Sequence, residues 1–135
     1  MLVPTISFQG NCDEALAFYK DTLGAEVQNV AYFKDAPADS GMDASLPPNF
    51  VMHSEVLLCG TKITMTDGGQ SPITGDFFSL TLDFDNPEEV AAVFNKLAEG
   101  GQVINALAEQ FWATLCGDVA DRFGIHWHIS TNDMQ

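Results

Sequence analysis

The most constraining feature of this sequence is an order of predicted elements that occurs twice. A helix pattern begins at Asn11, whose side chain is expected to cap the helix together with Glu14 three residues later, and it ends at Gly24. A second helix pattern begins at Asn86, with Glu89 at the same spacing, and ends at a glycine pair. Apolar residues recur at helical spacing within both segments. This internal repeat indicates two copies of one structural module.

Strand patterns surround both helices, one before and three after. They lie at Val3–Gln9, Glu26–Phe33, Val51–Cys59 and Thr61–Thr66 in the first copy, and at Phe77–Phe84, Gln102–Leu107, Ala113–Asp118 and Ile125–Ser130 in the second. The order predicts an α+β fold of two tandem β-α-β-β-β modules, about residues 1–66 and 77–130, joined by a connector at 67–76 within a single domain, 1–135. The two curved mixed sheets are expected to form a cup, with the helices on their convex faces.

Alternation along the strands predicts which side chains face this cup. Because successive strand residues point to opposite faces, apolar residues such as Phe78, Leu80 and Trp127 are expected to face the helices. The polar residues of opposite parity, expected to line the cup, are Lys62, Thr64, Thr66, Ser79, Thr81, Asp83, His126, His128 and Ser130.

Charge and composition exclude several classes of partner. The chain has 5 Lys and Arg against 19 Asp and Glu, for a net charge of −14, which argues against nucleic acid and anionic lipid as partners. It contains no apolar run of about 18 residues that could span a membrane, and its first six residues do not form a signal peptide. Cys12, Cys59 and Cys116 are odd in number and far apart, which indicates free thiols and a cytoplasmic location.

Several motifs, taken together, resemble those of one family. They are Ile6-Ser7-Phe8-Gln9-Gly10-Asn11-Cys12, Phe18-Tyr19, Leu23-Gly24-Ala25-Glu26, Met65-Thr66-Asp67-Gly68, Phe111-Trp112-Ala113 and Asp121-Arg122-Phe123-Gly124-Ile125-His126-Trp127. With the repeat, they look like the PhnB-like branch of the vicinal oxygen chelate superfamily, which includes glyoxalase I, extradiol dioxygenases and bleomycin resistance proteins. The resemblance runs nearly end to end and implies a homodimer. Proteins of this branch sometimes carry the name 3-demethylubiquinone methyltransferase, but this sequence contains no glycine-rich strand–helix motif for S-adenosylmethionine.

The resemblance also implies positions for metal ligands, on the first and last strands of each module. Those positions fall on Pro4, Thr64, Ser79 and His128. Only His128 has a side chain that binds divalent ions well, whereas a catalytic metal usually has three protein ligands. We therefore predict no cofactor. The alternative is a divalent metal held by His126 and His128, with His53 joining from another strand; a histidine of this set is also a candidate general base.

Two further segments suggest contacts with a ligand or a second subunit. Phe111 and Trp112 lie between two predicted strands, and two interpretations stay open: they stack on a planar ligand in the cup, or they are rim aromatics buried by packing, including a dimer contact. The segment 34–50 is long for a strand connection and contains three prolines. We expect it to be partly ordered at a subunit contact or at the mouth of the cup.

Three functions are compatible with these residues. The first, which we favour, is metal-independent binding of a small molecule by a homodimer. Its predicted ligand-binding residues are His53, Thr64, Ser79, Phe111, Trp112, His126 and His128. The second is a divalent-metal-dependent lyase, isomerase or dioxygenase of the same superfamily, and the third is a non-catalytic structural or regulatory dimer. The sequence names no ligand and leaves open whether a reaction is catalysed; Lys62 and Arg122 are the only basic residues expected near the cup, which offers little to hold a phosphonate.

Overall fold

The computed structural model describes residues 1–37, 47–68 and 77–132. The chain divides into two compact units, Met1–Pro72 and Ile73–Gln135, and each is described by itself. The predicted connector, 67–76, falls mostly outside the described residues. Within the part of the chain that is described, no helix is long and apolar enough to cross a membrane.

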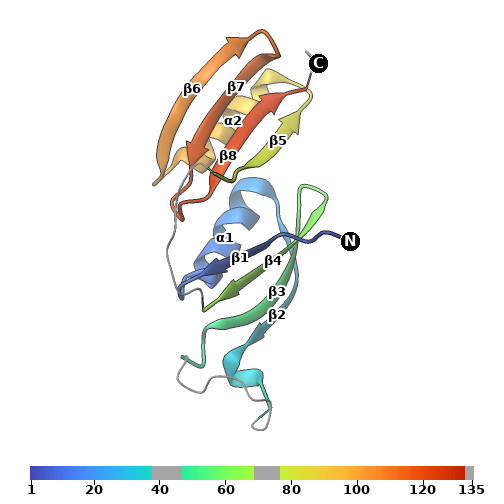
Figure 1. The fold of residues 1–135 in the computed structure, drawn as a ribbon, viewed down its shortest axis with the longest axis vertical. Coiled ribbons are helices and arrows are strands. Elements are labelled where there is room, and N and C mark those ends of the chain that lie inside the picture. Colours follow the sequence, from blue (N-terminus) through green and yellow to red (C-terminus); the bar gives the residue numbers. More distant parts are fainter. Residues whose placement is uncertain (38–46, 69–76, 133–135) are drawn as a thin grey trace. The chain divides into compact units, whose positions relative to one another are not determined.

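The first unit is a four-stranded mixed sheet with one helix (Figure 1). Its elements are β1 (Thr5–Phe8), α1 (Cys12–Leu23), β2 (Glu26–Tyr32), a 3₁₀ turn η1 (Phe33–Asp35), β3 (Val51–Leu58) and β4 (Thr61–Asp67). The strand order is β1-β4-β3-β2, in which β1 and β4 are parallel and the other neighbours are antiparallel. The helix therefore connects an edge strand to the opposite edge.

The second unit repeats this arrangement. Its elements are β5 (Leu80–Phe84), α2 (Pro87–Ala98), β6 (Gln102–Gln110), β7 (Ala113–Ala120) and β8 (His126–Thr131). The strand order is β5-β8-β7-β6, again with a single parallel pair, β5 and β8. The predicted α+β fold of two β-α-β-β-β modules is thus confirmed, while the shared cup, which depends on how the two units are placed, stays a prediction.

Burial follows the predicted alternation in β8. Trp127 and Ile129 are almost fully buried, and α2 packs against β7 and β8 on that side of the sheet. His126, which precedes Trp127, and His128, which lies between Trp127 and Ile129, are only partly buried, as expected for the opposite face. Ser130 was expected on that polar face as well, but it is buried and its hydroxyl donates to the carbonyl of Thr131.

The start of β5 differs from the sequence prediction. The strand begins at Leu80 instead of Phe77, and Phe77 and Phe78 precede it with exposed side chains. Phe78 was expected to face the helix but is 64% exposed. The apolar character of this segment predicted a strand, but the pairing of β5 with β8 begins only at Leu80, which is the register partner of Trp127.

The two helices are capped differently. Asn86 caps α2 as predicted: its Oδ1 accepts from the Glu89 amide at 2.8 Å, and the Glu89 carboxylate accepts from Asn86 Nδ2. The predicted cap of α1 by Asn11 is wrong, because Asn11 makes no side-chain cap bond. The Asp67 carboxylate at the end of β4 replaces it and accepts from the amides of Gly10 and Cys12 at 2.8 and 3.0 Å.

The longest motif of the second unit organises a turn between β7 and β8. Asp121 is 3% exposed, and its Oδ1 accepts from the amides of Phe123 and Ile125. Its Oδ2 accepts from Trp127 Nε1 at 2.9 Å. Gly124 has a φ of 87°, a conformation that glycine adopts without strain. The Asp, Gly and Trp of this motif therefore have structural roles.

The predicted loop 34–50 is described only at its two ends, since residues 38–46 lie outside the description. There, the Phe33 amide donates to the Phe50 carbonyl, and the Lys34 amide donates to the Pro48 carbonyl. Its predicted contact with a subunit or with the cup stays a prediction.

Candidate functional site

A hollow of about 460 Å³ lies on the polar face of the second sheet. Side chains and backbone of β6, β7 and β8 line it, together with the turn between β6 and β7: Ile104, Asn105, Ala106, Gln110, Trp112, Cys116, Gly117, Asp118 and His128. Its volume falls within the range of roughly 300–1,000 Å³ that is typical of small-molecule sites.

A carboxylate and an imidazole that are hydrogen-bonded to each other line this hollow. Asp118 on β7 and His128 on β8 are register partners, and the distance from Asp118 Oδ1 to His128 Nδ1 is 2.7 Å. Asn105 on β6 completes the set, since its Nδ2 donates to Asp118 Oδ2 at 2.9 Å. An ionised carboxylate only accepts hydrogen bonds, so it holds the proton on Nδ1 and leaves Nε2 of a neutral imidazole as an acceptor.

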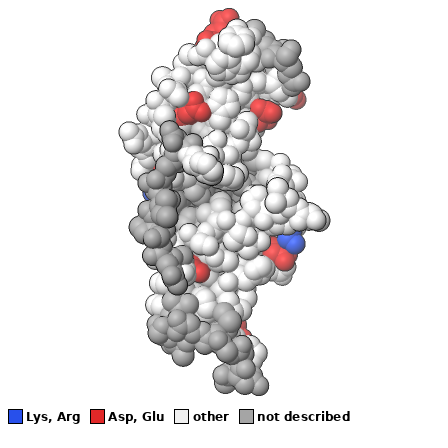
Figure 2. Space-filling model, viewed as in Figure 1, with Lys and Arg blue, Asp and Glu red and all other residues white. Residues whose placement is uncertain are grey.

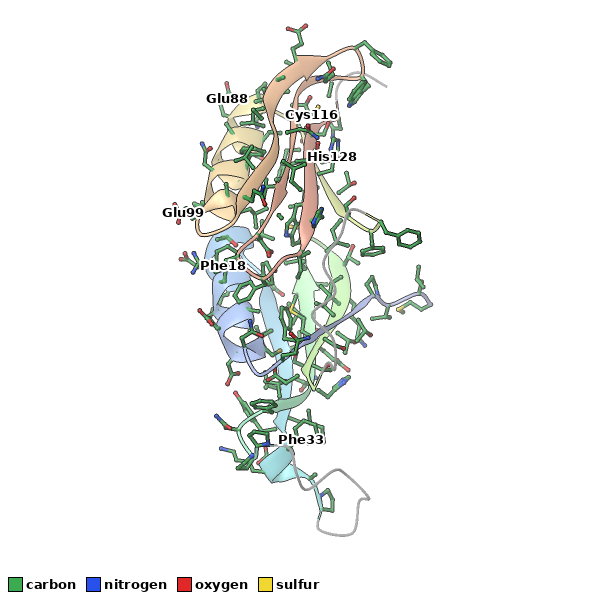
Figure 3. All side chains as sticks on the ribbon, turned by 60° about the vertical axis from the view of Figure 1, so that its left-hand side comes forward. Phe18, Phe33, Glu88, Glu99, Cys116 and His128 are labelled. Carbon is green, nitrogen blue, oxygen red and sulfur yellow. The ribbon has the colours of Figure 1, made fainter. Side chains whose placement is uncertain are left out.

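An aromatic ring and a thiol also line the hollow. Trp112 is 44% exposed and contacts the ring of Phe111 edge-on, with centroids 4.7 Å apart. Cys116 lies on β7, next to the strand of His128 (Figure 3). Burial and the nearby Asp118 raise the pKa of the Cys116 thiol, and a hydrogen bond from the Trp112 indole acts in the opposite direction. The thiol is therefore neutral near pH 7 and is a poor candidate nucleophile.

The structure separates the other predicted site residues of the second unit from this hollow. His126 lines a different hollow, of about 410 Å³, together with Arg122 and the turn after β7. Phe111 is 85% exposed at the tip of the β6–β7 hairpin and does not line the hollow of His128. Ser79 is exposed just before β5. Of the predicted residues in this unit, His128 and Trp112 are therefore brought together.

His53 and Thr64 belong to the first unit. His53 Nε2 lies 3.7 Å from Glu55 Oε1, and Lys62 Nζ lies 3.6 Å from the same oxygen. Lys62 lowers the pKa of Glu55, and hydrogen bonds from Asn29 and His53 act in the same direction. Thr64 is the register partner of Glu55 on β4. His53, Glu55 and Lys62 form a solvated polar network, because the side chains of His53 and Lys62 are about half exposed.

Sequence reasoning missed Asp118 and Asn105, although the internal repeat contained a signal for both. In the first unit, Asn29 and Glu55 are register partners joined by a hydrogen bond of 3.4 Å, as Asn105 and Asp118 are in the second. The register shift before Asn29 also recurs before Asn105. Aligning the two modules strand by strand therefore pairs an acid and an amide in each copy.

Comparison with known proteins places the chain in a family. A family model described as 3-demethylubiquinone-9 3-methyltransferase matches residues 1–130. Protein YjdN of Escherichia coli K12 is 36% identical over an alignment of 146 positions that covers 99% of this chain and 97% of that protein. This chain belongs to the PhnB-like family that this model describes, and it has the fold of the vicinal oxygen chelate superfamily.

Solved structures agree with this assignment. Protein PA1353 of Pseudomonas aeruginosa is 30% identical, with a TM-score of 0.82 and coverage of 98% of this chain and 97% of that chain. A PhnB protein from Bacillus cereus has a TM-score of 0.80 at 22% identity and covers 96% and 98%. The fosfomycin resistance protein FosX of Listeria monocytogenes has a TM-score of 0.72 at 12% identity, covering 99% and 94%, and shows the shared fold alone.

The residues at the superfamily's metal positions do not fit a divalent ion. The Pro4 carbonyl accepts from the Thr64 amide at 2.9 Å, so both of these backbone groups are engaged. Thr64 and Ser79 offer neutral hydroxyls, which are weak ligands for such ions. Of these four residues only His128 is a strong donor: Asp118 engages its Nδ1, and Nε2 remains as a single ligand atom, whereas a catalytic metal usually has three protein ligands. In residues 1–37, 47–68 and 77–132 no three His, Cys, Asp or Glu side chains are grouped as metal ligands. This PhnB-like protein therefore departs from the donor set of the metal enzymes.

Proposed function

We propose that this PhnB-like protein binds a small planar molecule, without a metal, in the hollow formed by β6, β7 and β8. One observation carries the proposal: the Asp118–His128 pair, with its 2.7 Å hydrogen bond, faces the same hollow as Trp112. The pair and Asn105 supply oriented polar groups, and Trp112 supplies an aromatic face for stacking. His128 Nε2 is a ready hydrogen-bond acceptor for a ligand, and it need not be a metal ligand.

We further propose that the protein acts in the cytoplasm as a homodimer. Apolar side chains on β6, an edge strand of the second unit, support this proposal, because Val103 and Ile104 are 46% and 43% exposed. Exposed large apolar side chains often mark protein contacts. Light scattering coupled to gel filtration tests the proposal: twice the monomer mass is expected, and a monomer at micromolar concentration contradicts it.

The binding experiment uses tryptophan fluorescence. The protein, treated with EDTA, is titrated with the neutral planar probe benzamide, and saturable quenching is expected because Trp112 is 44% exposed and Trp127 is 1% exposed. His128→Ala should remove the binding. His126→Ala is the matched control, since His126 lies on the same strand and face but lines the other hollow.

Three results would contradict this function. The first is the absence of quenching by any planar probe. The second is equal loss of binding in His128→Ala and His126→Ala. The third is binding that EDTA abolishes and Mn²⁺ or Zn²⁺ restores, which would favour the metal-dependent enzymes of the superfamily.

A further inference from the structure

The charges around the hollow determine which ligands it can accept. Among the described residues that line it, Asp118 is the one carboxylate, and none is Lys or Arg. All five basic residues of the chain are described, and none of them lines this hollow. An anionic ligand would therefore meet the carboxylate of Asp118 and, among the described lining residues, no Lys or Arg side chain to offset its charge.

Asp118 retains the capacity to bind a cation. Each of its oxygens accepts one hydrogen bond, Oδ1 from His128 and Oδ2 from Asn105. A carboxylate has about four acceptor positions, so both oxygens can still accept from a ligand. The Asp118 side chain is 33% exposed, which leaves it accessible from the hollow.

Trp112 adds an independent attraction. Its exposed indole ring belongs to the same lining, and an aromatic face attracts a planar cation electrostatically. The effect of Asp118 on its surroundings points in the same direction, because its negative charge contributes to the raised pKa of Cys116 after burial. A field that disfavours a thiolate also disfavours a bound anion.

The charge of the whole chain acts in the same sense. Asp and Glu outnumber Lys and Arg by 19 to 5, and Figure 2 shows acidic side chains at several places on the displayed face. Such a surface raises the local concentration of cations and repels anions at low salt.

We propose that the hollow of β6, β7 and β8 selects planar cations, such as aryl amidinium ions or protonated aromatic amines, over neutral molecules and over carboxylates and phosphonates. This inference rests on the proposed function and names its ligand class. A ligand of this class places its N–H donors on Asp118 and its ring against Trp112. In the tautomer that carries its proton on Nδ1, the imidazole of His128 accepts a further hydrogen bond at Nε2.

A series of probes with nearly the same shape tests the charge. Benzamidinium, benzamide, benzoate and phenylphosphonate are each titrated into the EDTA-treated full-length protein, with Trp112 fluorescence as the signal. Benzamidinium is expected to bind about tenfold more tightly than benzamide, the order of effect of one charge-assisted hydrogen bond. Benzoate and phenylphosphonate are expected to give no saturable quenching of the fluorescence. Added salt should weaken the binding of benzamidinium and leave the binding of benzamide unchanged.

Two variants locate the effect. Asp118→Asn keeps the shape and removes the charge, so benzamidinium should lose its advantage while benzamide still binds. Glu55→Gln is the matched control, because Glu55 is the register equivalent of Asp118 in the first unit and also accepts from an asparagine. This control should retain the preference, and circular dichroism confirms that both variants fold.

The outcomes separate this inference from the proposed function. Equal affinity for benzamidinium and benzamide refutes the cation preference and leaves the binding site standing. No quenching by any probe refutes the site itself. A preference that survives in Asp118→Asn shows that the charge of the whole chain causes it, and it overturns the role of Asp118. If phenylphosphonate binds tightly and Arg122→Gln abolishes that binding, the ligand is recognised in the hollow that His126 lines, and the proposal is refuted.

Discussion

Replacing Asp67 with Ala should destabilise the first unit far more than replacing Asn11, the residue that the sequence predicts as the helix cap. Asp67 is 7% exposed and joins three segments of the chain. Its Oδ1 accepts from the amides of Gly10 and Cys12, and its Oδ2 accepts from the Val51 amide at 2.9 Å. It thereby connects the end of β4 to the start of α1 and to the start of β3.

The magnitude follows from the amides that lose their acceptor. Those of Cys12 and Val51 belong to buried residues, and an unsatisfied buried donor costs about 1–3 kcal/mol. With the partly buried Gly10 amide and the lost attraction between the carboxylate and the helix N-terminus, the total is about 3–6 kcal/mol. The Asn11 side chain accepts an exposed hydrogen bond of 3.3 Å from the Gln9 amide, so Asn11→Ala should cost less than about 0.5 kcal/mol.

Urea unfolding followed by circular dichroism at 222 nm measures both free energies. Asn86→Ala provides a calibration, since it removes the exposed cap bond from the Glu89 amide and the exposed side-chain bond to the Glu89 carboxylate, and it should cost about 1 kcal/mol. Asp67→Asn should fall between Asp67→Ala and the wild type, because its amide group keeps one acceptor but presents a donor to the other amides. The reasoning is refuted if Asp67→Ala and Asn11→Ala differ by less than about 1 kcal/mol.

Three other predictions concern thiols and glycines. Ellman's reagent should modify the exposed Cys59 in the folded protein and the fully buried Cys12 only after unfolding; rapid modification of Cys12 would contradict its burial. Burial raises the pKa of Cys12 from 9.0 to about 12, so the unfolded state loses this proton first, and the free energy of unfolding should fall as the pH rises from 9 towards 12. A flat profile in urea titrations across that range would contradict the shift. Gly101→Ala should cost more than about 2 kcal/mol, because its Cβ would overlap the backbone oxygen of Ala120, whereas Gly24→Ala, with a φ of 65° in open space, should cost about 1 kcal/mol. Thermal denaturation ranks the two, and the reverse order would be a refutation.

The repeated fold could be predicted because its signals are local. Helical spacing, the Asn86 cap and the alternation of Trp127 with its histidine neighbours each depend on residues close together in the sequence, and the structure confirms all three. The errors occur where a distant strand decides. Phe77 and Phe78 have the composition of a strand, but β5 starts at Leu80, where its pairing with β8 begins.

The candidate site shows the same division. The sequence identified His128 as a polar residue on the sheet face opposite the helix, and Trp112 as an aromatic residue between two predicted strands. Asp118 was not identified from the sequence. Its role depends on the β7–β8 register, which places it opposite His128, and on the β6–β7 register, which places Asn105 beside it. Likewise, His126 and His128 share a strand face, but the surrounding turn and strands give each its own hollow.

The sequence by itself determined the two modules, the faces of their strands and the acidic character of the chain, since periodicity and composition are properties of neighbouring residues. The tertiary structure alone decided that Asp67 caps α1 and that Asp118 meets His128. In both cases a carboxylate reaches groups on other segments, and which segments become neighbours is set by the register of the strands and the packing of the sheet.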